Sequence, residues 1–134
     1  MPTIQIFNSF KEAVAEGVHN LGADTLKVAL TNTAPSLSNT QLSNITQIAG
    51  TGGYAPATAT VTSSAQSGGT YSLVIDAVTF TASGADFAAF RYFVLYNDTA
   101  TNDELIGFGD YGVAYVLPNG ESFTINAGTW LTNA

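Results

Sequence analysis

The sequence predicts a mainly β protein: an antiparallel β-sandwich or barrel-like domain with one short N-terminal α-helix. Its most apolar stretch, residues 90–99 (FRYFVLYNDT), is rich in aromatic and β-branched residues and is apolar at even and odd positions alike. A strand of this kind needs cover on both faces, so it belongs in the centre of a layered structure. Elsewhere, short alternating segments follow one another with turn residues between them, and a single segment near the N-terminus has helical spacing.

Length and composition define one β-rich domain over residues 1–134. Hydrophobic residues make up 46% of the 134 residues and charged residues only 10%. The chain therefore has enough apolar surface to fold, but little charge to keep a free monomer in solution. We expect part of its surface to contact other protein. The absence of cysteine excludes disulfides, thiolate chemistry and cysteine metal sites.

The charge balance excludes two classes of partner. The net charge is −7, and the three cations are Lys11, Lys27 and Arg91. Phosphate backbones and anionic membrane surfaces are bound by basic patches, so we expect neither nucleic acid nor a membrane as partner. No apolar run approaches the roughly 18 residues of a membrane span, and no basic, apolar leader opens the sequence.

The N-terminal part predicts a strand or an arm, followed by the helix. Residues 2–7 alternate loosely, which fits a short strand or, over residues 1–7, an N-terminal arm. Ser9 and Glu12 have the spacing of a capping box, and apolar residues continue along one face, so a helix is predicted near residues 9–19. The only histidine, His19, would then lie at the C-terminus of the helix and bind its last carbonyl groups.

A half-buried strand and a long loop follow the helix. Residues 24–31 alternate between apolar and polar side chains, which predicts a strand with one buried face. Residues 32–53 are rich in Asn, Thr, Ser and Gly, with isolated apolar residues and no clear period. They predict a long loop with one helical turn. Loops of this length inside a compact domain are usually functional or are ordered by a partner.

The middle of the chain predicts a hairpin that pairs with the central strand. Residues 58–62 and 71–81 are two predicted strands, and Gly68-Gly69 is the turn between them. Matching apolar rows place the second strand beside residues 90–99. The predicted cross-strand pairs are Tyr71 with Tyr96, Leu73 with Val94, Ile75 with Tyr92, and an ion pair of Asp76 with Arg91.

The C-terminal part predicts four further strands. These are residues 105–109, 111–117, 122–126 and 128–131, and the strong turn signal at residues 118–121 (PNGE) precedes the third of them. Because strand follows strand with turns between, the sheets are expected to be antiparallel.

No group of residues predicts catalysis, a cofactor or a metal site, so no such residues are assigned and we expect no enzyme. His19 has no nucleophile paired with it, and no serine lies in a Gly-x-Ser-x-Gly pattern. The acidic residues 97–104 offer oxygen atoms for weak Ca²⁺ binding, but their spacing is not that of an EF-hand and fits an ordinary hairpin loop. Residues 50–54 (GTGGY) lack the Gly-Lys-Ser/Thr of a phosphate-binding loop and are predicted to be a flexible turn.

Three stretches in this order together resemble a family of small virion structural proteins of tailed bacteriophages. They are residues 21–30 (LGADTLKVAL), 50–54 (GTGGY) and 91–99 (RYFVLYNDT). The helical segment precedes the first stretch, and residues 105–112 (LIGFGDYG) follow the last one. Each motif alone is weak, and the ordered set, which covers about residues 7–112, is more specific. The family has no catalytic residues to carry over.

The resemblance implies a virion structural protein, and the acidic charge narrows its place. Packaged DNA repels an acidic protein, so we expect it outside the DNA-filled lumen. The first expectation is a capsid decoration (cement) protein that bridges capsid subunits on the outer shell of the virion, after assembly in the host cytoplasm. Its partners would be the major capsid protein and copies of itself, as a homotrimer. The expected capsid or subunit interface consists of apolar arm and loop residues outside any clear strand, namely Thr3, Ile4, Ile6, Phe7, Leu37, Leu42, Ile45 and Ile48.

Two other functions remain open from the sequence. A tail tube, terminator or baseplate component would also be β-rich and oligomeric. A carbohydrate-binding or receptor-binding module would use exposed aromatic side chains such as Tyr54, Tyr115 or Trp130.

Overall fold

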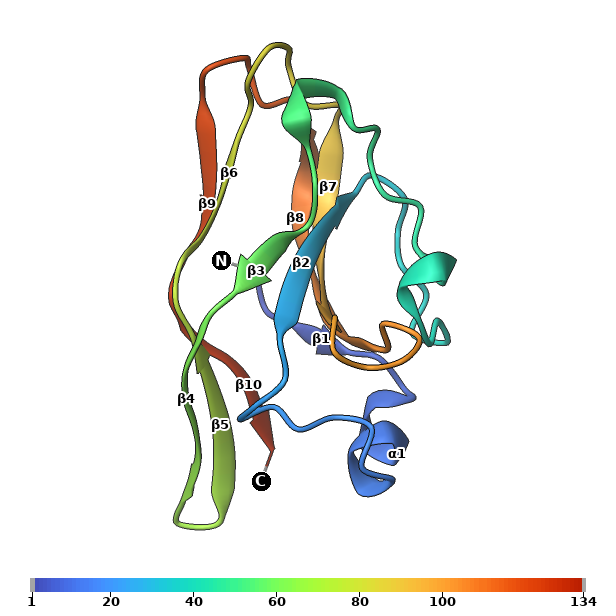
Figure 1. The fold of residues 1–134 in the computed structure, drawn as a ribbon, viewed down its shortest axis with the longest axis vertical. Helices are drawn as coiled ribbons and strands as arrows, with labels where there is room; N and C mark the ends of the chain where they lie inside the picture. Colours follow the sequence, from blue (N-terminus) through green and yellow to red (C-terminus); the bar gives the residue numbers. More distant parts are fainter. Residues whose placement is uncertain (1, 134) are drawn as a thin grey trace.

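The computed structural model describes residues 2–133 and consists mostly of strands (Figure 1). The elements in chain order are β1 (Gln5–Ile6), α1 (Phe10–Ala15), β2 (Leu26–Thr31), η1 (Leu42–Asn44), η2 (Thr51–Gly53), β3 (Ala57–Ala59), β4 (Val61–Ser67), β5 (Thr70–Ile75), β6 (Val78–Thr81), β7 (Phe90–Asn97), β8 (Leu105–Tyr115), β9 (Ser122–Ile125) and β10 (Gly128–Asn133). None of the helices within residues 2–133 has the length and apolar character of a membrane span.

The strands form two layers with all neighbours antiparallel. One layer is a five-stranded sheet in the order β1-β8-β7-β2-β3. The other combines a three-stranded sheet, β10-β5-β4, with the two-stranded ribbon β6-β9, which continues it along the long axis of the molecule (Figure 1). The layers pack as in a sandwich and do not close into a barrel. The predicted fold class is confirmed, with the sandwich as the correct alternative.

The central strand lies where its composition places it. β7 is the middle strand of the five-stranded sheet, and its side chains are buried on both faces. Phe93 and Leu95 face the core between the layers, whereas Val94 and Tyr96 belong to a second cluster on the opposite face. The neighbouring strand β2 is likewise buried on both faces, so the prediction of a half-buried strand there was wrong.

Two segments that the sequence predicts as single strands are each divided in the structure. Residues 71–81 form β5 and β6, which are separated at Asp76 and Ala77 and pair with different strands. The Asp76 carboxylate accepts a hydrogen bond from the Ala77 N–H, which favours a local turn over a ladder bond. The chain likewise changes sheets at Thr60, where β3 ends in one layer and β4 begins in the other. Such strand breaks are how sandwiches turn their corners.

The predicted pairing of the middle hairpin with the central strand was wrong. β5 pairs with β4 and β10, and β7 pairs with β2 and β8. Arg91 therefore lies opposite β8 and binds Asp110, not Asp76. The six residues of the three predicted cross-strand pairs each have other neighbours in the sheets. On β5, Tyr71 lies opposite Gln66 and Asn133, Leu73 opposite Ser64 and Leu131, and Ile75 opposite Val61 and Gly128. On β7, Tyr92 lies opposite Thr31 and Asp110, Val94 opposite Ala29 and Phe108, and Tyr96 opposite Lys27 and Leu105.

The C-terminal strands follow the prediction with one difference. Residues 105–109 and 111–117 were predicted as separate strands, but β8 runs without interruption from Leu105 to Tyr115. The predicted turn before β9 is present, with the Glu121 N–H bound to the Pro118 carbonyl at 3.0 Å.

The predicted helix is shorter, and its capping box does not form. α1 has six residues, and its N-cap Ser9 is itself in the helical region, with φ −73° and ψ −12°, and makes no side-chain cap bond. Phe10 is the only buried side chain of α1, so little packing supports a longer helix. Gly17, with φ +78°, ends the segment early.

The N-terminal residues extend one edge of the main sheet, and part of the long loop packs on its outer face. Residues 5–6 form β1, which pairs with β8, so the strand alternative and not a free arm is observed. Residues 32–53 contain two short 3₁₀ turns, η1 and η2, where one helical turn was predicted. The loop runs along one side of the five-stranded sheet (Figure 1).

The η2 segment is a packed structure and not the flexible turn that was predicted. Gly52 is buried with φ +69°, and a Cβ atom there would lie 2.7 Å from the Ala85 carbonyl oxygen. The hydroxyl of Tyr54 accepts a hydrogen bond from the Leu30 N–H at 2.9 Å and donates one to Gln47 at 2.8 Å. Burial raises the pKa of this hydroxyl to about 12, so it remains a donor.

Candidate functional site

The expected interface residues divide between the protein core and the surface. Three are buried, three are partly buried, and two are exposed. The buried residues are Phe7, Ile45 and Ile48, the partly buried residues are Ile4, Ile6 and Leu42, and the exposed residues are Thr3 and Leu37.

The structure brings several of these residues together, but around a core of their own chain. Phe7 and Ile45 belong to one buried cluster with Tyr92, Val94 and other side chains of the main sheet, and Leu42 packs against it. Ile45 and Leu42 of the long loop therefore cover the outer face of the main sheet, whereas Ile48 belongs to the core between the layers. Of the loop residues named, Leu37 is the most exposed, at 40%, and it remains available to a partner.

A different surface has the features of an interaction site: an irregular bulge in β8. On β7 the ladder advances from Phe90 to Tyr92, while the paired positions on β8 run from Tyr115 to Asp110. Two steps on one strand thus face five steps on the other, so β8 carries three extra residues. These residues lie within 111–114, have no partner on β7, and residues 112–114 are exposed. Bulges of this kind re-aim side chains and often occur beside functional sites.

Hydrogen bonds at the base of the bulge fix its shape. The Arg91 Nε and Nη2 groups donate to the two carboxylate oxygens of Asp110 at 2.8 and 3.2 Å. The Gly112 N–H donates to the same carboxylate at 2.7 Å, and Gly112 has φ +83°, which favours glycine. The guanidinium of Arg91, followed by this backbone bond, lowers the pKa of Asp110, so the carboxylate stays ionised at neutral pH.

The bulge and the two residues that follow it present an apolar surface to solvent: Val113 lies in the bulge, Tyr115 ends β8 and Val116 comes next. Val113, Tyr115 and Val116 are 56%, 42% and 57% exposed, and no charged residue interrupts residues 112–117. We call these three side chains the bulge surface. Below it, the Tyr115 ring contacts Phe123, with centroids 6.0 Å apart. Adjacent exposed apolar side chains on a rigid base are typical of a protein–protein contact.

Sequence reasoning named Tyr115 as an exposed aromatic residue but missed Val113 and Val116 beside it. The signal was the uncharged run at residues 112–117, which was interpreted as an ordinary strand. An alternating strand would have hidden half of these side chains, and only the register with β7 shows that residues 111–114 have no partner on that strand.

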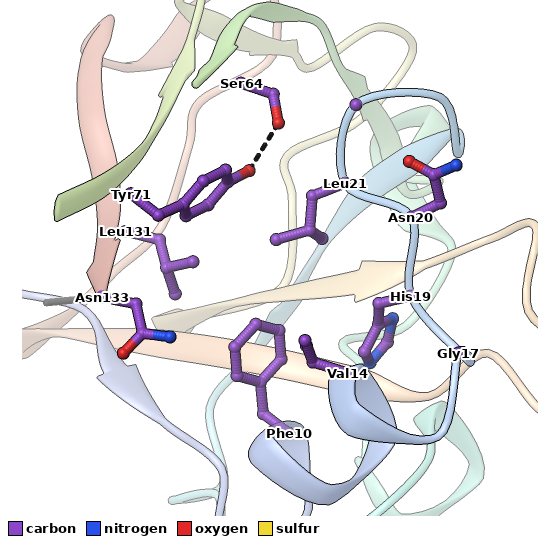
Figure 2. Close-up of a pocket in the computed structure, with 11 residues that line it drawn as sticks. Phe10, Val14, Gly17, His19, Asn20, Leu21, Ser64, Tyr71, Leu131 and Asn133 are labelled. Carbon is purple, nitrogen blue, oxygen red and sulfur yellow. Dashed lines mark hydrogen bonds between the residues drawn. The ribbon is translucent and has the colours of Figure 1, made fainter. Parts of the chain in front are cut away.

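A pocket of about 680 Å³ lies between α1, the loop before β2 and the second layer (Figure 2). Phe10, Leu21 and Leu131 point toward its centre from three different elements (Figure 2). The polar pair nearest to them is already satisfied, because Ser64 Oγ and the Tyr71 hydroxyl lie 2.7 Å apart in a hydrogen bond. No Asp, Glu, Lys or Arg lines the pocket, so its chemistry suits an uncharged group.

His19 lies at the margin of this pocket, in a buried polar cluster. Its side chain is 7% exposed and stacks on Phe10, with ring centroids 5.4 Å apart. Asn97 Nδ2 lies 3.0 Å from His19 Nδ1 and 2.7 Å from the Asp24 carboxylate. His19 therefore binds side chains and not the last carbonyl groups of the helix, and that prediction was wrong.

The orientation of Asn97 determines the protonation state of His19. Asn97 Oδ1 accepts hydrogen bonds from the N–H groups of Thr99 and Ala100, so its Nδ2 group must be the one that faces His19. Nδ2 is a donor, and Nδ1 of His19 must accept, which requires a neutral ring. Burial lowers the pKa of His19, and the nearby Glu104 and Asp24 carboxylates only partly offset this effect. Within residues 2–133, His19 Nε2 and Glu104 Oε2 have no hydrogen-bond partner.

The other residues with expected ligand roles lie as follows. Tyr54 and Trp130 are buried, so Tyr115 is the exposed member of the three aromatic residues named for a carbohydrate site. In the acidic loop after β7, Asp98 forms an ion pair with Lys27 of β2, with an N–O distance of 3.5 Å. Among the residues that the structure describes, no group of three His, Cys, Asp or Glu side chains is arranged to hold a metal ion.

Comparison of the chain with protein-family models, curated proteins and solved structures finds no match.

Proposed function

We propose that this chain is a structural protein of a tailed-bacteriophage virion, and specifically a decoration protein on the outer capsid shell. The observation that carries the proposal is the bulge surface, which presents three apolar side chains on a base fixed by the Arg91–Asp110 pair. The motif order that resembles phage virion proteins supports the same role. A surface of this kind costs little conformational entropy on binding, because its shape is set before the partner arrives.

The charge of the protein is consistent with a place outside the shell. With a net charge of −7, packaged DNA would repel the chain from the capsid lumen. The bulge surface carries no charge, so a contact through it desolvates apolar groups without burying a carboxylate.

The proposed partners are the major capsid protein and further copies of this chain, in a homotrimer. One small apolar contact per chain is weak. Several such contacts in one oligomer add through effective concentration, so the assembly can hold neighbouring capsid subunits together without a strong site on any single chain. No cofactor and no catalytic step enter this role.

The test is binding of the purified protein to expanded shells that lack it, with the copy number measured. We expect stoichiometric binding and greater resistance of the shells to heat. Val113→Asp places a carboxylate on the bulge surface and should weaken binding at least tenfold. The matched control Thr101→Asp adds the same charge at an exposed loop position and should bind as the wild type does.

Two results would contradict the proposal. Wild-type protein that leaves the shells free would remove the decoration role, and rings or tubes of the purified protein in electron micrographs would then favour the tail alternative. Equal binding by both aspartate variants would show that the contact lies elsewhere on the molecule.

A further inference from the structure

β4 leaves one edge of the second layer unpaired. It has seven residues, and its ladder with β5 uses only one side of the strand. Among residues 2–133 no other strand pairs with it, and it forms the outer margin of its sheet (Figure 1). An open edge presents a row of N–H and carbonyl groups, and the partner that fits such a row is another extended strand.

β4 lacks two of the features that usually protect an edge, and its ladder with β5 is irregular only at one end, between Val61 and Ser63. Its sequence, VTSSAQS, contains no charged residue and no proline. The other margins are shorter or less open: β1 and β3 have two and three residues, β6 and β9 have four each, and Pro2 and Ile4 lie with Thr129 around a cavity beside β10. The long, uncharged edge is therefore a particular feature of β4.

We propose that β4 pairs antiparallel with β4 of a second copy of this chain. The result is one six-stranded sheet across a twofold axis, in the order β10-β5-β4-β4-β5-β10. The inference does not depend on the virion role proposed above. The contact has twofold symmetry, so it is also separate from the threefold contact of a homotrimer.

Electrostatics favours a second copy at this edge. Two chains of charge −7 repel each other, and they can meet most easily where neither carries charge. The nearest acidic residue along the ladder is Asp76, whose N–H binds the Thr60 carbonyl just before β4. In an antiparallel pair centred near Ser64 the two Asp76 residues lie at opposite ends, roughly 25 Å apart at about 3.3 Å per residue. This separation exceeds the Debye length of about 8 Å at physiological salt.

The side chains of β4 also suit self-pairing. In the register centred near Ser64, the Ser64 side chains of the two chains face each other, Ser63 faces Ala65 and Thr62 faces Gln66. These pairs are short or uncharged, and a pair of hydroxyl side chains stabilises antiparallel strands. The chain already uses this device between β6 and β9, where Thr79 and Thr124 lie 3.1 Å apart and Thr81 and Ser122 lie 2.8 Å apart.

The first test is the solution mass of the purified full chain over a range of concentrations. We expect the wild type to reach a dimer or a larger even-numbered assembly. Ser63→Lys with Ala65→Lys places lysines on exposed positions of the edge and should raise the dissociation constant at least tenfold. Thr101→Lys with Asn102→Lys gives the same change of net charge in an exposed loop and should associate like the wild type.

A second test uses the absence of cysteine in the chain. Ser64→Cys should form a disulfide-linked dimer under mild oxidation, because residue 64 faces its own copy at the twofold axis. Ala127→Cys, at an exposed position outside β4, should stay monomeric on a non-reducing gel. Circular dichroism and thermal unfolding identify any variant that fails to fold.

Clear results would overturn the proposal. The first is a wild-type protein that remains a monomer or a trimer at its highest soluble concentration. The second is a dimer that persists in the folded double-lysine variant. The third is equal cross-linking of both cysteine variants. Loss of the dimer in Val113→Asp alone would assign self-association to the bulge surface instead. None of these measurements needs a capsid, so failure here and failure of the proposed function are distinguishable.

Discussion

Gly109 lies where the ring of Phe93 crosses β8, and the ring leaves no space for a side chain. A Cβ atom at this position would be 2.2 Å from Phe93 Cε1. The ring cannot move freely, because it is fully buried and packs against Tyr111 and Trp130. We expect Gly109→Ala to lower the free energy of unfolding by about 1–3 kcal/mol, the usual cost of overpacking a core.

Urea unfolding measures this change, and Gly50→Ala is its control. Gly50 has φ −73°, and a Cβ atom there meets nothing closer than 4.0 Å, so alanine fits without strain. The control should leave stability unchanged or raise it by about 0.4–1 kcal/mol. Equal midpoints for Gly109→Ala and the wild type would show that Phe93 has room to move.

His19 makes stability depend on pH in the range where the carboxylates of this protein are mostly ionised. The ring is neutral in the folded chain, because its Nδ1 accepts from Asn97 and burial lowers its pKa below 6.5. The unfolded chain binds a proton near pH 6.5, so below this value it takes up more protons than the folded chain. Stability is therefore full above pH 6.5 and falls as the pH drops, by at most about 1.4 kcal/mol per pH unit for one proton.

The measurement is the free energy of unfolding at pH 7.5 and pH 5.5. His19→Asn retains an acceptor near the position of Nδ1 but cannot take up the proton, so its stability should change less between the two conditions. Carboxylates that titrate in this range change the free energy of unfolding of the wild type and the variant alike, so their effect cancels in the difference between the two proteins. An identical loss in wild type and variant would mean that the folded chain accepts the proton as readily as the unfolded chain.

At the scale of elements, the long loop separates residues that support the fold from residues open to a partner. Ile45 is buried against the outer face of the main sheet, whereas Leu37 is 40% exposed. Ile45→Ala should cost about 2–5 kcal/mol in the free energy of unfolding, as expected for a buried isoleucine. Leu37→Ala should stay within about 0.5 kcal/mol of the wild type. Thermal or urea unfolding of the two variants measures the difference, and similar losses would contradict the burial pattern.

The elements that could be predicted from the sequence are those that their own residues specify. β7 was found from its own composition, because aromatic and β-branched residues at consecutive positions require a strand covered on both faces. The Gly68-Gly69 turn and the 118–121 turn were found from residues that favour turns. Pairing could not be found in this way. Whether β5 lies beside β7 or β10 depends on contacts far apart in sequence, and several registers match equally well in apolar pattern.

The candidate site could not be predicted for the same reason. Asp110 and Arg91 are 19 residues apart, and only the observed register places them on opposite strands with the bulge between. The apolar loop residues Ile45 and Ile48 were assigned to an interface because they lie outside strands, but loop residues can also cover a sheet.

At the scale of the whole molecule, two uncharged surfaces lie at opposite ends. The bulge surface adjoins the β6–β9 ribbon through the contact of Tyr115 with Phe123, whereas the β4–β5 hairpin occupies the other end of the long axis (Figure 1). If the β4 edges join two chains, the two bulge surfaces lie outside the seam and remain free. The pair could then contact two capsid subunits at once, which raises the effective concentration of the second contact.

The net charge predicts how the proposed capsid contact responds to salt. A contact through Val113 and its neighbours is apolar, and the surrounding charge of −7 does not assist it. Raising the salt from about 0.1 M to 1 M shortens the Debye length from roughly 10 Å to 3 Å and screens repulsion from an acidic shell, while leaving apolar burial intact. Co-sedimentation with the shells measures binding at both salt concentrations, and we expect binding at 1 M salt to be as strong as at 0.1 M or stronger. Val113→Asp should be weaker than Thr101→Asp at both. Release of the wild type at high salt would instead identify an ionic contact through the few cations of the chain, and would move the interface away from the bulge surface.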